Sequence, residues 1–215
     1  MNRIIVAVVA LGACTTYVVD GDSPSSQEPG DLEFTWRVGT SDCSEAGLDR
    51  VALFLDGEEA AEFDCEDGFG AIERLDPGRY TARLVGRDTN GWGRYAADLG
   101  DVEVESSVAT ALPTAVLGAL PGSIVVTWYF ENARMCGANG VSDVEVTLFD
   151  DEYVVESQAV PCDSGILAFE GVRAGEYQLN VMGREADGRA VYNGTGGVQL
   201  DKGDRTDVEV ALIGL

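Results

Sequence analysis

The chain of 215 residues contains no histidine, and Lys202 is its only lysine. Without an imidazole, Ser-His-Asp catalysis, Cys-His catalysis and histidine metal sites are excluded, which leaves carboxylate, tyrosine, lysine or N-terminal chemistry. Positive charge is also scarce, because 14 Lys and Arg face 38 Asp and Glu for a net charge of −24. Such a field repels phosphate backbones, and the chain has no phosphate-binding glycine loop and no basic stripe. We therefore expect no enzyme, no cofactor and no nucleic-acid partner.

Long apolar runs are scarce as well. The run Ile4–Leu11 follows a single positive charge and is too short to span a bilayer. It closes with Gly12-Ala13 before Cys14, which predicts a secretory signal over residues 1–13. This ending resembles the lipobox of bacterial lipoproteins, and with Thr15 next the resemblance implies an acylated Cys14 and a lipid anchor in the outer membrane, on its periplasmic or cell-surface side. The alternative is an ordinary cleaved signal followed by a chance cysteine.

The rest of the chain is an internal repeat. Leu32–Trp36 matches Ile124–Trp128 at an offset of 92 residues, and Val51–Leu55 matches Val144–Leu148 at an offset of 93. Later matches keep an offset of 97, namely Pro77–Tyr80 with Ala174–Tyr177, Gly86–Asp88 with Gly183–Glu185, and Tyr95 with Tyr192. The offset changes only in loop-like stretches, where insertions disturb no core. We predict two copies of one domain, residues 31–118 and 121–215, with a short junction over 117–122 and a polar tether over 14–30.

Each copy is typical of an all-β domain. Apolar and polar residues alternate around Trp36 in the first copy and around Trp128 in the second, so both indoles are expected in the core. Asp56-Gly57 predicts a hairpin between Val51–Leu55 and Glu58–Asp64. Val102–Val104 and Val208–Leu212 are expected to be the closing strands, and no segment has a sustained helical period. Six to eight short strands in about 90 residues predict an antiparallel β-sandwich, repeated in tandem.

Two matched segments also resemble a known family. Asp67-Gly68-Phe69 leads to Leu75–Leu84 in the first copy, and Asp163–Ile166 leads to Val172–Leu179 in the second. These segments resemble the transthyretin-like repeats called carboxypeptidase regulatory-like domains, whose recurring feature is a Gly-apolar strand, a turn ending in Pro-Gly and then a Tyr on the next strand. The resemblance implies noncatalytic structural or binding modules. Both copies lack the family's Gly-x-Val opening, so a fibronectin-like topology remains the alternative.

Four cysteines follow Cys14, and exported proteins favour disulfides. Four thiols allow three pairings. The repeat selects among them, because Cys43 matches Cys136 and Cys65 matches Cys162. We therefore predict one disulfide in each copy, Cys43 with Cys65 and Cys136 with Cys162. A metal site of four thiolates would need close Cys-x-x-Cys pairs, which the sequence lacks.

Trp92 differs from the other two tryptophans because it follows the turn Asn90-Gly91 and has Arg189 at its equivalent position. We expect an exposed ring there. Trp92 and its neighbour Tyr95 are therefore the candidate ligand contacts, either for a sugar ring or for a protein partner. The alternative is that Trp92 caps the end of the sandwich.

Two groups of side chains invite a calcium hypothesis, and they are Asp88, Asn90, Asp98 and Asp101 in the first copy and Asp201, Asp204 and Asp207 in the second. Calcium takes six to eight oxygens at defined spacing, and neither group follows a D-x-D-x-D-G loop. Solvated turns and charged edge strands explain them more simply. We expect no metal site.

The sequence therefore predicts a noncatalytic, lipid-anchored envelope protein that presents tandem β-sandwich modules to a protein partner or has a structural role. One alternative is a carbohydrate-binding module that uses Trp92 and Tyr95. The other is an adhesion protein stiffened by calcium.

Overall fold

The computed structural model describes residues 28–215. The predicted signal, the predicted lipidation site Cys14 and most of the predicted tether lie outside these residues. The described chain is built almost entirely of β-strands, which confirms the predicted fold class of two tandem β-sandwich domains. In this part of the chain, no helix has both the length and the apolar character needed to cross a bilayer.

The first domain runs through ten elements. They are β1 (Gly30–Val38), α1 (Cys43–Ala46), β2 (Arg50–Leu55), β3 (Glu58–Asp64), η1 (Cys65–Asp67), β4 (Phe69–Leu75), β5 (Gly78–Arg87), β6 (Gly93–Val104), β7 (Ala109–Ala111) and β8 (Ala115–Ala119).

The second domain repeats this order without a counterpart of β7. Its elements are β9 (Gly122–Phe130), η2 (Cys136–Asn139), β10 (Asp143–Asp150), β11 (Tyr153–Pro161), η3 (Cys162–Ser164), β12 (Ile166–Val172), β13 (Gly175–Arg184), β14 (Ala190–Leu200) and β15 (Arg205–Gly214).

The two domains have the same sheet topology. The strand order is β3-β2-β5-β6-β8-β1-β4 in the first domain, with β7 also paired to β1, and β11-β10-β13-β14-β15-β9-β12 in the second. The pairings β6–β8 and β14–β15 are short, so each path folds into two layers of a sandwich. The first strand of each domain lies parallel to the last, β1 to β8 and β9 to β15. Residue alternation gives no sign of these parallel neighbours.

Each core lies between the two layers and is apolar. Along β1, buried and more exposed side chains alternate, and Phe34 and Trp36 face the core. Trp36 and Trp128 are 5% and 8% exposed, which confirms the prediction that both indoles are buried. Alternation of this kind stabilises a strand because one face loses water while the other stays solvated.

The predicted hairpin is present between β2 and β3. Asp56 and Gly57 have φ values of 53° and 84°, and a two-residue turn with both residues in the left-handed region matches the twist of the flanking strands. Gly57 adopts this conformation without steric cost, and Asp is among the residues that tolerate it best.

Both predicted disulfides are present. Cys43 is bonded to Cys65 and Cys136 to Cys162, across sequence separations of 22 and 26 residues. Each bond joins the helical turn after the first strand to the helical turn before the edge strand, that is α1 to η1 and η2 to η3. These short turns are the helical elements of the described chain, and each ends at a glycine with positive φ.

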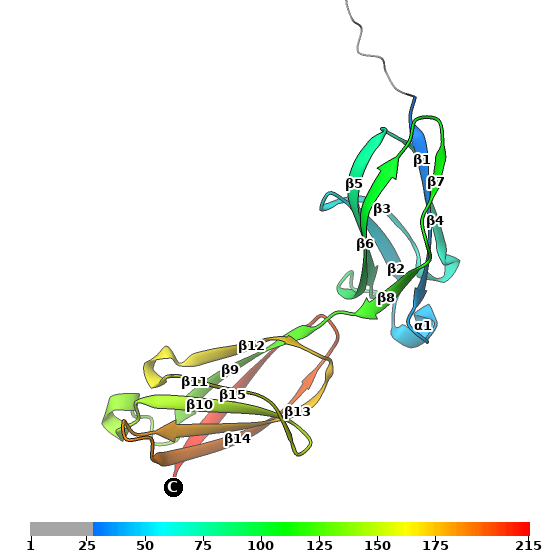
Figure 1. The fold of residues 1–215 in the computed structure, drawn as a ribbon. Helices are drawn as coiled ribbons and strands as arrows, with labels where there is room; N and C mark the ends of the chain where they lie inside the picture. Colours follow the sequence, from blue (N-terminus) through cyan, green and yellow to red (C-terminus); the bar gives the residue numbers. More distant parts are fainter. Residues whose placement is uncertain (1–27) are drawn as a thin grey trace, which may run out of the picture.

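The prediction that Val102–Val104 closes the first domain is wrong. These residues form the end of the long strand β6, and the closing strand is β8. Leu117, expected in the junction, is fully buried in the first core as part of β8. Sequence alternation missed β8 because its pattern is short and rich in alanine and glycine. The connection between the domains is therefore only Leu120-Pro121, and the domains lie end to end (Figure 1).

Candidate functional site

The loop between β5 and β6, which carries Trp92, is organised by one carboxylate. Oδ1 of Asp88 accepts hydrogen bonds from the backbone N–H groups of Asn90, at 2.9 Å, and Trp92, at 3.0 Å. Oδ2 accepts from Nε of Arg94 at 2.7 Å. The Asp88 side chain therefore fixes the turn and also orients the guanidinium of Arg94.

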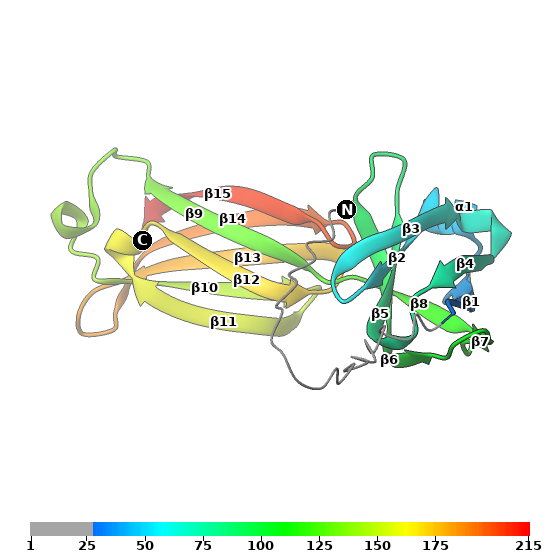
Figure 2. The same ribbon diagram turned by 90° about the horizontal axis from the view of Figure 1, so that it is seen from above.

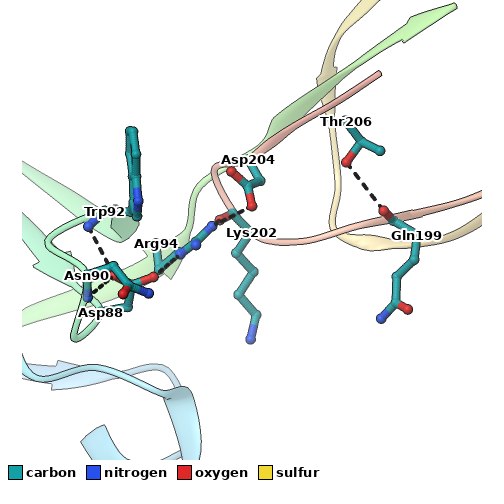
Figure 3. A network of polar contacts seen from close by, with 8 residues as sticks. All are labelled: Asp88, Asn90, Trp92, Arg94, Gln199, Lys202, Asp204 and Thr206. Atoms are coloured by element: carbon teal, nitrogen blue, oxygen red, sulfur yellow. Dashed lines mark hydrogen bonds and ion pairs between the residues drawn. The ribbon is translucent and has the colours of Figure 1, made fainter. Parts of the chain in front are cut away.

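Arg94 connects this loop to the second domain, as Figure 3 shows. Its Nη1 donates to the backbone carbonyl of Lys202 at 3.0 Å and lies 3.1 Å from a carboxylate oxygen of Asp204. Both acceptors lie on the turn between β14 and β15. The Arg94 side chain is only 19% exposed, so these bonds are better shielded from water than an ordinary surface ion pair.

Backbone contacts complete the junction. The N–H of Gly203 donates to the carbonyl of Leu120 at 2.9 Å, and the N–H of Leu120 donates to the carbonyl of Arg94 at 2.9 Å. A Cβ on Gly203 would lie 2.4 Å from the carbonyl oxygen of Gly93, and the φ of Gly203 is 66°. Glycine is therefore required here both for its conformation and for the close approach of the two domains.

The two candidate ligand contacts have different environments. The side chain of Trp92 is 65% exposed, whereas Tyr95 is 9% exposed and belongs to the first core. The ammonium of Lys202 lies 5.0 Å from the centre of the Tyr95 ring, which is a cation–π contact across the junction. Only Trp92 of the pair offers an open ring, so the structure provides no two-ring platform for a sugar.

The electrostatics of the junction favour its charged form. Burial of Asp88 opposes ionisation and is the largest single effect, but hydrogen bonds from Arg94, Trp92 and Asn90 together outweigh it and lower the pKa of this carboxyl. The hydrogen bond to Asp88 raises the pKa of Arg94; burial opposes this rise, and the bond to Asp204 adds to it. The Asp88–Arg94 pair therefore carries its full charge at neutral pH.

The carboxylates of the calcium hypothesis do not converge on a common point. Asp88 and Asp204 are bound to Arg94, Asp98 lies 3.5 Å from Arg83, and Asp207 lies 2.9 Å from Arg205. Among residues 28–215, no group of three Asp, Glu, Cys or His side chains is arranged to hold a metal ion. We make no calcium proposal.

A groove at the outer end of the second domain was not predicted from the sequence. We call it the distal groove, and its cavity volume is about 510 Å³. It is lined by the end of β9, the following loop and η3, with the residues Trp128, Tyr129, Phe130, Glu131, Ala133, Arg134, Met135, Cys136, Cys162, Asp163 and Gly165. Figure 2 shows that these segments lie at the end of the second domain away from the first domain.

The distal groove is apolar and exposed. Met135 and Tyr129, which both line the groove, are 80% and 48% exposed, and clustered exposure of large apolar side chains is uncommon on a protein surface. Acidic Glu131 and Asp163 and basic Arg134 supply its charges. An exposed apolar patch beside a few charged groups is typical of an interaction surface.

No protein-family model and no curated protein matches the chain. Among solved structures, the TIE protein of Bacillus anthracis is similar over 87% of this chain and 34% of its own, at 13% identity and a TM-score of 0.39. A leucine-rich repeat protein of Bacteroides thetaiotaomicron is similar over 88% of this chain and 26% of its own, at 13% identity and a TM-score of 0.34.

A minor pilin of Streptococcus agalactiae is similar over 86% of this chain and 96% of its own, at 10% identity and a TM-score of 0.34. The chain thus spans about a third and a quarter of the lengths of the first two of these proteins. At such identities and TM-scores, the likenesses carry no argument about function. The candidate sites therefore rest on the geometry of this chain alone.

The distal groove has a sequence signal that can be recognised only with the structure. The first domain has Phe63 two residues before Cys65, and the second has Val160 two residues before Cys162. The ring of Phe63 packs against Phe34 and Trp36, at centroid distances of 5.4 and 6.0 Å. The difference between Phe63 in the first domain and Val160 in the second can be interpreted only once this packing is known.

Proposed function

We propose that the protein is a noncatalytic component of the bacterial envelope that binds a protein partner through the distal groove. The observation that carries this proposal is the position of an exposed apolar groove at the free end of the second domain. The rest of the molecule acts as a spacer that holds this end away from the point where the chain enters the first domain.

The chain enters at the opposite end of the molecule. Hydroxyl groups of Ser106 and Ser107 donate to the backbone carbonyl and the carboxylate of Glu28, at 2.8 and 2.6 Å, and the N–H of Ser107 donates to the carbonyl of Pro29 at 3.3 Å. Figure 1 shows this entry point at the far end of the first domain from the junction. An anchor that precedes residue 28 would therefore leave the distal groove as the outermost surface.

We further propose that the anchor is lipid on Cys14 and that the protein resides at the outer membrane. Two or more acyl chains hold a protein firmly, whereas one holds it only weakly. The test is fractionation of cells that express the wild type or Cys14→Ser after labelling with an alkyne fatty acid. We expect label and membrane association only in the wild type. Equal membrane association of both would contradict lipid anchoring.

The noncatalytic role is supported by the side-chain inventory. The chain has no histidine. The carboxylates Asp88 and Glu145, which are among the less exposed acids, are engaged by Arg94 and Arg184. Burial of Asp88 opposes ionisation, but hydrogen bonds from Arg94, Trp92 and Asn90 outweigh it and lower the pKa of this carboxyl, which makes it a weak proton donor at neutral pH.

Site-specific photocrosslinking tests the proposed function directly. A photoreactive amino acid replaces Met135 in the distal groove or, as a control, Thr40 in the corresponding loop of the first domain. In intact cells, we expect one discrete adduct from position 135 and none from position 40, and the identified partner should form the same adduct when purified. No adduct, or equal adducts from both positions, would contradict the proposal.

A further inference from the structure

In the first domain, β1 continues past the start of β4, and hydrogen bonds from the protein's own chain cover this end of the strand. The backbone N–H of Trp36 donates to the carbonyl of Gly68 at 3.0 Å, and the N–H of Ser41 donates to the carbonyl of Val38 at 2.9 Å. The indole N–H of Trp36 donates to the carbonyl of Cys65 at 2.9 Å. The ring of Phe63 then packs against the same indole, so this end of the strand is filled.

The second domain keeps one of these bonds, because the N–H of Ala133 donates to the carbonyl of Phe130 at 2.8 Å as Ser41 does to Val38, but it leaves the edge open at Trp128. β12 begins at Ile166, opposite Thr127, whereas β9 continues to Phe130. The described residues show no bond from Trp128 to Gly165 that corresponds to the bond from Trp36 to Gly68. Among the described residues, the last three residues of β9 therefore have β15 on one side and no strand on the β12 side.

Two further observations point to the same opening. The indole N–H of Trp128 is buried and has no hydrogen-bond partner within residues 28–215, and Trp128 lines the distal groove with only 8% of its surface exposed. Val160 stands where the first domain has the Phe63 ring. Buried donors are nearly always paired in folded proteins, so an unpaired one marks an incomplete site.

We propose that an extended segment of the protein partner binds here by strand addition. The segment continues the line of β12, pairs its backbone with Trp128 and with the N–H of Phe130 on β9, and places one apolar side chain in the distal groove. The carbonyl of Phe130 is not available to it, because this carbonyl accepts from the N–H of Ala133 at 2.8 Å. The backbone N–H of Trp36 points toward β4, so the backbone N–H of the equivalent Trp128 points toward the β12 side. Because backbone groups alternate in direction along a strand, the N–H of Phe130 points to the same side. This inference rests on the proposed function and specifies how the partner is recognised.

Charge indicates which segment fits. Glu131 and Asp163 lie on the distal groove with one basic side chain, Arg134, and the whole chain carries a net charge of −24. A segment with arginine or lysine beside its apolar side chain is therefore attracted, whereas a second copy of this acidic chain is repelled. The paired stretch of β9 is three residues, about 10 Å at 3.3 Å per residue, so the apolar side chain must supply much of the affinity.

Synthetic nonapeptides test the mode of binding. The parent probe alternates Val and Thr around a central Leu and has an Arg at each end; one matched probe has Glu at each end, and another has N-methyl groups on alternate backbone amides. Binding is measured by fluorescence anisotropy to the folded two-domain protein. We expect the N-methylated and the Glu-flanked probes to bind at least tenfold more weakly than the parent.

A protein variant provides an independent check. Val160→Phe should fill the opening as Phe63 does in the first domain, and it should weaken binding of the parent probe at least tenfold. Trp92→Ala, which removes an exposed ring elsewhere, should leave binding unchanged. Circular dichroism of both variants confirms that they are folded. The comparison of the parent and N-methylated probes uses the wild-type protein, so it does not depend on the folding of any variant.

The outcomes separate this inference from the proposed function. Equal binding of the parent and N-methylated probes, or no binding of the parent, would overturn strand addition. If position 135 still gives a discrete adduct in cells, the partner docks through a folded surface and the proposed function stands. A concentration-dependent dimer that Val160→Phe abolishes would identify a second copy as the occupant and would also overturn the inference.

Discussion

Arg94 of the first domain and Asp204 of the second lie 3.1 Å apart, and the same guanidinium is held by Asp88 of its own domain. We predict that Arg94→Ala destabilises the protein by about 2 kcal/mol, because hydrogen bonds to charged groups are lost at a shielded position. NMR relaxation should then show the two domains tumbling separately. Arg189→Ala is the control, because its exposed pair with Glu185 lies in the loop between β13 and β14 and involves neither Arg94 nor the turn that Arg94 contacts. Unchanged joint tumbling of the Arg94 variant would contradict the role of this residue.

Gly203 gives a second test of the junction. Gly203→Ala places a methyl group 2.4 Å from the carbonyl oxygen of Gly93, so the second domain must move away from the first. The matched control is Gly188→Ala, where φ is also positive, at 86°, but where no atom lies within 4 Å. Both variants carry the strain of positive φ, and only Gly203→Ala should change the small-angle X-ray scattering profile.

The pH dependence of the junction follows from Asp88. Its pKa in the folded protein lies below the ordinary value of 3.8. A lowered pKa stabilises the folded state fully above the unfolded value, and this contribution disappears as pH falls through the folded value. We expect the difference in melting temperature between Arg94→Ala and the wild type to be largest at neutral pH and to shrink as the pH falls below 3.8. A difference that grows as the pH falls below 3.8 would contradict Asp88 as the titrating partner.

Each disulfide should stabilise its own domain. Sequence separations of 22 and 26 residues give about 3.4 kcal/mol for each bond from chain entropy. We predict that Cys43→Ser with Cys65→Ser lowers the denaturant midpoint of the first domain while the second stays folded. The reciprocal pair of substitutions should affect mainly the second domain. Unfolding is followed by near-UV circular dichroism, and loss of both domains from either pair of substitutions would contradict independent bonding.

Much of the fold was predictable because the repeat compares the chain with itself. The disulfides could be predicted from the sequence alone, because Cys43 is equivalent to Cys136 and Cys65 is equivalent to Cys162. The alternation of apolar and polar residues predicted the core, because a half-buried strand exposes every second residue to water. It missed β8, whose small residues give little contrast between its two faces.

The functional surfaces were less predictable because they depend on residues far apart in the chain. Lys202 covers Tyr95, although 107 positions separate them in the sequence, so the buried ring could not be distinguished from an exposed one. The distal groove exists because Trp128 lacks the contacts that Trp36 makes in the first domain. Trp36 packs against the ring of Phe63, its backbone N–H donates to Gly68 and its indole N–H donates to Cys65. A repeat shows which residues correspond, but only the packing shows which contact has been lost.

The most direct test of the account is amide hydrogen exchange in the free protein, measured by NMR at the backbone N–H groups of Trp36 and Trp128. These two residues occupy equivalent strands, and within the described residues only the backbone N–H of Trp36 has an acceptor on the side of the edge strand, the carbonyl of Gly68. We predict exchange at least tenfold faster at Trp128 than at Trp36. Equal protection of the two amides would show that the second domain is closed as well, and would contradict an open edge at the distal groove.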